Sequence, residues 1–509
     1  MKPSTDLHTL IHSLTTSEKG YIRKMAAVTS GKKNSGYMRL YDLVEQQPVY
    51  DEQAILKQYK NEKVAKQLPV IKNYLFKLIL KLLRNYKDAN SDESILSNRI
   101  LNSDLLFEKG MYSSSFSELE YAADLSIHLD APLKLLEVKS KERALHLEIA
   151  AKNWKEAIGK NIDETKQILT DYTNYIELFS VYYQLMHFWR HHRIIRNPDE
   201  QKMLDDLMRH PLMKSNRKHK GFYTHLVFLS NHLAYHFVSG NDDLALKYQQ
   251  QILAHWDAHS HFKVNEPLKY LAAVNNFVNV CYRANRLDLV KSGIERFNEV
   301  SCAGKESIEA VAFENKNAAR LAYLFATLKF DNAEQILDEM KAGFTKYKGK
   351  INPVRELMLK FNTVILYWVQ NKMPEAIDVA NEILNEKDIE LRKDMQAALR
   401  MIYLILHFEL NNTFMLEYAI RSAKRYLKLN DKLYETERMF FRYLLKLNSK
   451  GSNKERFAVY CKMHAELTNI LENHPLERNL QQTFDLNNWL NPKIQGISLK
   501  EYLLQQGTL

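Results

Sequence analysis

The sequence predicts an all-α protein built as an α-solenoid of antiparallel helix hairpins, preceded by a basic helical module. Glycine and proline together supply only 25 of 509 residues, fewer than folds with many tight strand turns use. Apolar residues recur at the three- and four-residue spacing of helices, and no long alternating stretch typical of a strand is present. A short polar break followed by a small residue returns with a period of about 43 residues.

Residues 1–90 do not follow this repeat and are predicted to form a separate module of short helices. The helices are expected near 4–14, 17–28, 36–47, 51–60 and 69–87, with N-caps at Thr15 to Ser17 and at Asp51. Pro69 suits the first position of the last helix. That helix is amphipathic, with its apolar side chains on one side at about 100° per residue and a row of cations on another.

The net charge of +11 is concentrated in this module, which holds sixteen Lys and Arg against eight Asp and Glu. A short helix, a turn and a basic amphipathic helix are the outline of a helix-turn-helix DNA-binding domain. We therefore expect contact with nucleic acid or another anion through Lys32, Lys33, Arg39, Lys63, Lys66, Lys77, Lys81 and Arg84. Lys63 and Lys66 join this row if the helix begins upstream of Pro69. The alternative is a capping domain whose basic face is simply solvated.

Residues 91–448 are predicted to form about eight helix-hairpin repeats. The breaks end at Ser115, Ala157, Ala245, Val290, Ala333, Ala376 and Ala419, at intervals of 42, 88, 45, 43, 43 and 43 residues. Each small residue would let the second helix of a hairpin approach the first. The breaks contain Gly110, Gly240, Asn285 and Asn371, residue types that adopt the left-handed conformation that ends a helix. Prolines at 132, 267 and 353 are expected at first helical positions.

The break pattern resembles the tetratricopeptide repeat. It reads Gly or Asn, then an aromatic residue or Leu two positions later, then Ala three positions after that; residues 152–157, with Trp154, are a good copy. The resemblance covers about residues 95–448, and the period is about 9–11 residues longer than the 34 of that family. The whole chain is also similar to a group of uncharacterised bacterial helical-repeat proteins, which brings no assigned activity. The resemblance implies a concave face that binds a peptide or a partner protein.

Residues 449–509 are predicted to close the array as a C-terminal helical cap. A polar loop near 448–453 marks the boundary. A terminal repeat must hide one apolar face, and Trp489, Leu490 and Leu503 are expected to cover it.

Histidines gather between positions 187 and 261, where eleven of the eighteen lie. Three pairs have the i, i+4 spacing that can place two imidazoles on one metal: His187/His191, His232/His236 and His255/His259, with Asp257 nearby. Packing is the favoured interpretation, because His236 occupies the same register position as Cys281 and Leu324 between paired helices. We therefore expect no metal site.

The sequence contains no recognisable catalytic motif. Two stretches, residues 31–36 and 343–350, have glycines spaced roughly as in a phosphate-binding loop. In the first, Tyr37 and Met38 stand where such a loop needs Lys and Ser or Thr. Neither a nucleophile elbow, a zinc-protease motif nor a dinucleotide fingerprint is present. We expect no enzyme activity and no cofactor; an enzyme built on distributed residues is a third hypothesis.

Location and partners are the last expectations. The three cysteines are far apart and show no disulfide or zinc spacing, which favours a reduced, cytoplasmic protein without membrane segments. We expect non-catalytic binding of a protein or peptide in the solenoid groove, with Trp189, Arg190 and Arg193 as candidate groove residues. The alternative is a nucleic-acid-binding regulator in which residues 1–90 hold DNA and the repeats sense or bind a partner.

Overall fold

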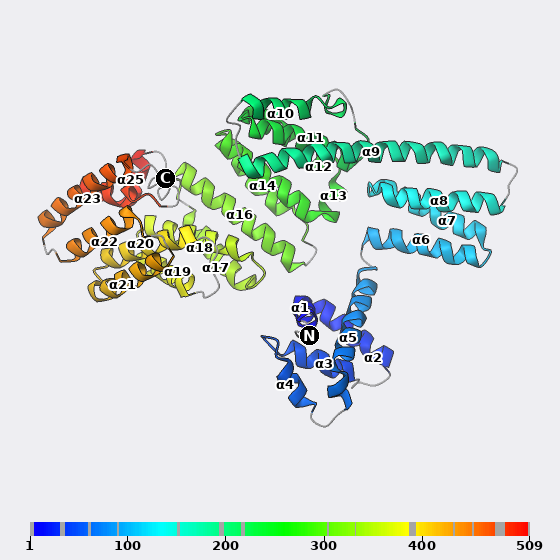
Figure 1. Ribbon diagram of the computed structural model, residues 1–509, viewed down its shortest axis with the longest axis horizontal. Coiled ribbons are helices and arrows are strands. Elements are labelled where there is room, and N and C mark those ends of the chain that lie inside the picture. The colour runs from blue at the N-terminus through cyan, green and yellow to red at the C-terminus, as the bar shows by residue number, and fades with distance from the viewer. Residues whose placement is uncertain are drawn as a thin grey trace. The chain divides into compact units, whose positions relative to one another are not determined.

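The structure is entirely helical over the residues that it describes. A computed structural model describes residues 5–30, 36–59, 63–88, 91–149, 153–192, 198–214, 219–302, 305–330, 332–385, 393–430, 433–449, 452–473 and 484–506. These ranges contain 25 α-helices, two short 3-10 helices and no strand (Figure 1). The all-α prediction is therefore confirmed. The chain divides into two compact units, Met1–Asn231 and His232–Leu509, which are described separately.

The first unit begins with the predicted helical module. Its helices are α1 (Asp6–Ser13), α2 (Thr16–Ser30), α3 (Gly36–Glu45), α4 (Glu52–Gln58) and α5 (Lys63–Asp88). Their apolar sides enclose one small core that includes Ile22, Leu40, Tyr41, Leu75 and Ile79. The expected N-caps are present: Thr15 exchanges hydrogen bonds with Glu18, and the Asp51 carboxylate accepts from two backbone N–H groups of α4.

Helix α5 begins earlier than the sequence indicates. Pro69 lies inside the helix and not at its first position, so the expected start at this residue is wrong. Proline at an interior position removes one intrahelical hydrogen bond. Burial of Leu68, just before the proline, in the module core offsets this cost and holds the first two turns in place.

The remainder of the first unit consists of longer packed helices. These are α6 (Asp92–Glu108), α7 (Tyr112–His128), α8 (Pro132–Ile149), α9 (Trp154–His192) and α10 (Pro198–Met208), with the 3-10 helix Pro211–Met213. Tight turns join α6 to α7 and α7 to α8, so neighbouring helices run antiparallel (Figure 1). Asp130, in the turn before α8, accepts a hydrogen bond of 2.8 Å from the backbone N–H of Tyr223 at the start of α11 (Phe222–Val238). The carboxylate thereby caps a helix distant in the sequence.

The second unit contains five hairpins built on the predicted breaks, one further helix pair and a C-terminal segment. Its helices are the end of α11, α12 (Asp242–Ala258), α13 (Ser260–Asn265), α14 (Pro267–Arg283), α15 (Leu287–Arg296), the 3-10 helix η2 (Phe297–Glu299), α16 (Glu306–Thr327), α17 (Ala333–Lys346), α18 (Pro353–Val369), α19 (Met373–Asn385), α20 (Lys393–Glu409), α21 (Thr413–Leu429), α22 (Glu435–Asn448), α23 (Asn453–Asn473), α24 (Asn487–Gln495) and α25 (Leu499–Gln506). The second helices of the hairpins (α12, α15, α17, α19 and α21) begin at intervals of 45, 46, 40 and 40 residues. The spacing is near 43 residues but is not constant.

The hairpin turns have the backbone conformation that the sequence predicts. Gly110, Gly240, Asn285 and Asn371 all have positive φ, between 52° and 74°. In each turn the N–H of the following residue donates to the carbonyl five residues earlier, at 2.8–2.9 Å. The small residue at which each break ends is buried at every position except Ala157. Prolines 132, 267 and 353 each occupy a first helical position, as expected.

The C-terminal segment 484–506 lies against the first helices of several hairpins. The Trp489 ring is buried among Phe408 of α20, Phe440 of α22 and Tyr460 of α23. Leu490 is also buried there, but Leu503 packs with residues of α16, α17 and α18 and so does not cover the last hairpin. The expectation for Leu503 is wrong because α25 turns back along the array. We call the face of α18, α20 and α22 beneath this segment the covered side.

None of the helices that the structure describes is long and apolar enough to cross a bilayer.

Candidate binding surfaces

The basic side chains predicted on α5 lie on its outward face. Lys77, Lys81 and Arg84 are exposed, and none of them forms an ion pair with another described residue. Val70 and Tyr74 continue the same line toward the start of the helix and are 69% and 53% exposed. The opposite side of α5 is buried in the module core, so the amphipathic prediction is confirmed. The result is a helix face with a cationic end and an apolar end.

The other predicted anion-binding residues are not part of this face or are not described. The Arg39 guanidinium donates to the Gln58 carbonyl at 3.0 Å and lies 4.8 Å from the centre of the Tyr59 ring. These contacts hold α3 against the end of α4. Lys32 and Lys33 lie outside the described residues, as do the side chains of Lys63 and Lys66.

The predicted groove residues fall at the end of α9. Trp189 is half-buried there, and the preceding residue, Phe188, is buried. Arg193 lies outside the described residues, and so does the side chain of Arg190. Their role as a partner groove stays a prediction.

A line of exposed apolar side chains runs along α9, and the sequence analysis missed it. Its members are Ile162, Leu169, Ile176, Phe179 and Tyr183, which are between 40% and 64% exposed. Four of them recur at every seventh residue, which places them almost in one row on a helix. The opposite side of α9 buries Leu178, Val181 and Leu185. The seven-residue recurrence was visible in the sequence, but which side of α9 packs inward was not.

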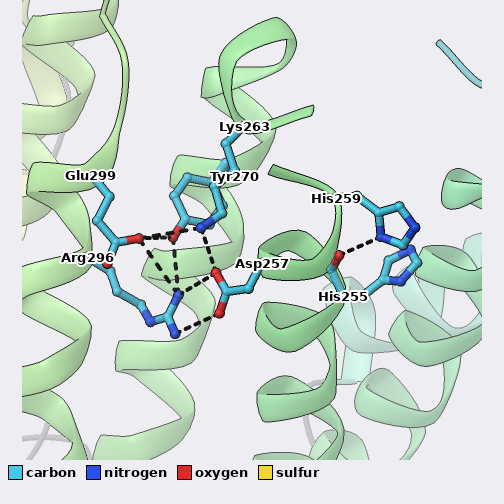
Figure 2. Close-up of polar contacts among 7 residues, drawn as sticks. All are labelled: His255, Asp257, His259, Lys263, Tyr270, Arg296 and Glu299. Atoms are coloured by element: carbon cyan, nitrogen blue, oxygen red, sulfur yellow. Dashed lines mark hydrogen bonds and ion pairs between the residues drawn. The ribbon is translucent and has the colours of Figure 1, made fainter. Parts of the chain in front are cut away.

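A charged cluster joins α12, α13, α14 and α15 in the second unit (Figure 2). The Arg296 guanidinium makes two hydrogen bonds of 3.0 Å to the two carboxylate oxygens of Asp257. The Lys263 ammonium lies 2.6 Å from the same carboxylate and 3.5 Å from that of Glu299. The Tyr270 hydroxyl donates to Glu299 at 2.9 Å and accepts from Arg296 at 3.3 Å.

The cluster balances its own charges. Burial by itself would raise the pKa of Asp257, but hydrogen bonds from Arg296 and Lys263 outweigh it and lower that pKa. Hydrogen bonding to Asp257 raises the pKa of Arg296. Burial raises the pKa of the Tyr270 hydroxyl. Two cations face two carboxylates, so the cluster acts as a clamp between two hairpins and presents neither a free base nor a free nucleophile.

Asp257 therefore faces away from the histidines with which the sequence groups it. The His255 and His259 rings lie 4.6 Å apart on the other side of α12, and His259 Nδ1 is 2.9 Å from the carbonyl of His255 (Figure 2). Within the described ranges, no three His, Cys, Asp or Glu side chains are arranged to hold a metal ion. In a second pair, the His232 and His236 rings stack on the Tyr248 ring at 4.6 and 5.5 Å. The third pair, His187/His191, cannot be compared because the side chain of His191 lies outside the described residues.

Two titratable residues, His236 and Cys281, share the register position that the sequence assigns to packing between paired helices. Burial lowers the pKa of His236, in line with the predicted packing position between paired helices. Cys281 is fully buried, and burial raises the pKa of its thiol to about 12. Such a thiol is not a nucleophile at neutral pH.

A scan against protein-family models matched none of them, and searches of curated proteins and of solved structures likewise returned no match. The resemblance to tetratricopeptide repeats therefore stays a prediction, and function must be argued from the surfaces themselves.

Proposed function

We propose that this protein is a non-catalytic scaffold that binds a partner protein through the exposed apolar row on α9. The row consists of Ile162, Leu169, Ile176, Phe179 and Tyr183, and its exposure is the observation that carries the proposal. Proteins that act alone seldom leave this many large apolar side chains in one line on a single helix. The cytoplasmic location expected from the sequence belongs to the same proposal.

The spacing of the row favours a helical partner. From Ile162 to Tyr183 the row covers 22 residues, and the 21 steps between them extend over about 32 Å of helix at 1.5 Å per residue. A seven-residue recurrence suits an amphipathic helix packed lengthwise, because its own side chains then insert between those of α9. An extended peptide would present side chains every second residue and would match this spacing poorly.

The experiment selects partner helices directly. A displayed library of amphipathic helical peptides is panned on the full-length protein, and enriched peptides are resynthesised with a fluorescent label. Fluorescence anisotropy then compares wild type with Leu169→Glu/Ile176→Glu. We expect at least about a tenfold loss of affinity, because two buried apolar contacts worth about 1 kcal/mol or more each are replaced by charges.

A matched variant tests whether the effect is specific to the row. Gln167→Glu/Thr170→Glu changes the charge of α9 by the same amount at two exposed positions away from the row. This control should bind like wild type, and circular dichroism should show equal helix content in all three proteins. Failure to enrich any peptide, or equal binding to the row variant, contradicts the proposal. A dimer that dissociates only in the row variant would assign the row to a second copy of this chain.

The outward face of α5 supports a second candidate function, the binding of nucleic acid by residues 1–90. The specific observation is that Lys77, Lys81 and Arg84 line one exposed helix face without ion pairs to described residues, with Tyr74 beside them. Unpaired cations on one face of a helix are suited to a row of phosphates, and an exposed ring can stack on a base.

Anisotropy with labelled duplex DNA over a salt series tests this candidate. Lys81→Gln/Arg84→Gln should reduce the slope of log affinity against log salt by about 2, since each lost phosphate contact removes about 0.9. Lys24→Gln/Lys57→Gln removes two exposed charges from the same module and should leave the slope unchanged. Absence of binding at low salt, or equal slopes for the two variants, contradicts the candidate.

A further inference from the structure

The outward face of α21 combines two exposed aromatic rings with a row of cations. Phe414 is 88% exposed and Tyr418 is 65% exposed. Arg421, Arg425 and Lys428 continue the line at the helical spacing of three and four residues and are all exposed. These five side chains, which we call the α21 face, lie within a narrow arc and extend over about 21 Å of helix.

The exposure of this face is not a sign of a loosely packed helix. On the opposite side of α21, Leu416, Ala423 and Leu427 are buried in the main core of the second unit. The α21 face is therefore the outward side of a firmly anchored helix.

The cations of the α21 face differ from several other cations of the second unit that the chain itself pairs with a carboxylate. Arg320 is paired with Glu339, Lys372 with Glu334, and Arg283 with Asp242. Arg421, Arg425 and Lys428 form no ion pair with a described residue, and Glu417 is a single exposed carboxylate beside them. An unpaired cluster of three positive charges is complementary to a partner that supplies carboxylates or phosphates.

Elsewhere in the same unit, one carboxylate contacts both an aromatic residue and a cation of a single helix. In α24 the Trp489 indole N–H donates to Glu409 at 2.8 Å, and the Lys493 ammonium lies 2.5 Å from the other oxygen of that carboxylate. The ring of Trp489 meanwhile packs on apolar rings of α20 and α22. One carboxylate next to apolar side chains thus satisfies an aromatic residue and a cation that lie one helical turn apart.

We propose that the α21 face binds an acidic segment of a partner protein, which places apolar side chains on Phe414 and Tyr418 and carboxylates on Arg421, Arg425 and Lys428. Aliphatic neighbours favour a protein over a nucleic acid: Met415 and Leu429 flank the face and are 47% and 74% exposed. Phosphates offer no apolar surface to cover them, and bases offer little aliphatic surface beyond the thymine methyl group. This inference rests on the proposed scaffold function, names a partner chemistry for it, and uses a surface separate from the α9 row.

The test uses the full chain and a peptide of defined chemistry. A fluorescein-labelled peptide of about fifteen residues, rich in Glu with Leu or Phe at every third or fourth position, matches the length of the face when helical. A second peptide has Gln in place of every Glu. We expect the Glu peptide to bind at least about tenfold more tightly than the Gln peptide and to weaken as salt rises.

Variants identify the surface that binds. Arg421→Gln/Arg425→Gln/Lys428→Gln and Phe414→Ala/Tyr418→Ala should each lose about tenfold or more in affinity. Lys454→Gln/Lys462→Gln/Lys500→Gln removes three exposed cations elsewhere in the same unit and should bind like wild type. Leu169→Glu/Ile176→Glu, on α9, should also leave this binding unchanged, so the two proposals fail or succeed separately.

Three results would overturn the inference. The first is no binding of the Glu peptide at low salt. The second is equal loss of affinity in the α21 charge variant and in its matched control, which would indicate non-specific attraction. The third is that labelled single-stranded DNA, or vesicles of phosphatidylserine, depend on the α21 face and bind more tightly than the peptide. That outcome would assign the face to phosphates instead of carboxylates.

Discussion

Two regions of the second unit carry an aromatic ring and a cation within one helical turn, and they differ in their surroundings. In α24, Trp489 is buried and shares the carboxylate of Glu409 with Lys493. In α21, Tyr418 is 65% exposed and Arg421, three residues later, forms no ion pair with a described residue. Both helices belong to the same unit, and both pairs combine an aromatic residue with a cation.

The difference teaches that the presence of an aromatic residue beside a cation does not decide whether such a pair supports the fold or faces outward. On the covered side, the chain itself supplies the carboxylate and the apolar rings. On α21, no described part of the chain does so, and these side chains contribute little to folding. We expect substitutions on the covered side to change stability, and substitutions on the α21 face to change binding while leaving stability almost unchanged.

The largest expected effect is at Trp489. Trp489→Ala should lower the free energy of unfolding by about 3–5 kcal/mol, because it removes a buried ring and leaves a cavity among Phe408, Phe440 and Tyr460. Chemical denaturation followed by circular dichroism measures this loss. Phe414→Ala is the matched exposed aromatic and should change stability by less than about 0.5 kcal/mol. Similar losses for both variants would remove the distinction between the two regions.

A smaller effect is expected at the charged cluster of α12–α15. Arg296→Gln should destabilise by about 1–2 kcal/mol, because Asp257 loses two charge-assisted hydrogen bonds but keeps Lys263. The effect should shrink in high salt. Arg421→Gln serves as the exposed comparison and should lie within about 0.5 kcal/mol of wild type in the same denaturation experiment. A loss of unfolding free energy in the Arg421 variant as large as that in the Arg296 variant would show that the α21 face contributes to the fold.

Acidification should lower the stability of the fold through a histidine of the buried helix α20, and it should not change binding at the α21 face. His407 is buried, and burial lowers its pKa below the ordinary 6.5. Its Nδ1 lies 3.3 Å from the amide nitrogen of Asn412, and its Nε2 has no hydrogen-bond partner among the described residues. The unfolded chain therefore takes up a proton at higher pH than the folded chain, so stability present above pH 6.5 declines as the pH falls through 6.5 towards the lower folded value.

Denaturation midpoints at about pH 7.5 and 5.5 measure this decline. His407→Leu removes the titrating group and should reduce the difference between the two midpoints. Since α21 contains no histidine, binding of the Glu-rich peptide should not share this dependence. An unchanged difference in the variant would place the pH sensitivity elsewhere.

The smallest expected stability change is on the α21 face itself. Arg421→Gln/Arg425→Gln/Lys428→Gln should alter the free energy of unfolding by less than about 0.5 kcal/mol, because these charges form no ion pair with a described residue. Thermal unfolding and peptide anisotropy on the same samples compare stability with binding. Unchanged stability with lost binding sharpens the comparison, whereas a large stability loss contradicts it.

Sequence reasoning predicted the helices well but not the surfaces that remain exposed. The hairpin turns at Gly240, Asn285 and Asn371 and the helix starts at Pro267 and Pro353 are signals confined to a few neighbouring residues. Backbone sterics and the missing proline N–H fix them whatever the rest of the chain does. For the candidate surfaces, the row of cations on α5 was predictable for the same reason, because the amphipathic period of one helix reveals its outward side.

The sequence by itself determined the turns that end helices at Gly240, Asn285 and Asn371 and the buried small residue that comes five positions after each. Only the tertiary structure decided which faces the chain covers with its own residues. Asp257 pairs with Arg296, 39 residues later, and not with the neighbouring histidines; Leu503 packs on α16 to α18 and not on the last hairpin. Such contacts join residues that are far apart in sequence, and their choice depends on how whole helices dock. The exposure of the α9 row and of the α21 face follows from the same docking, because no described residue covers either one.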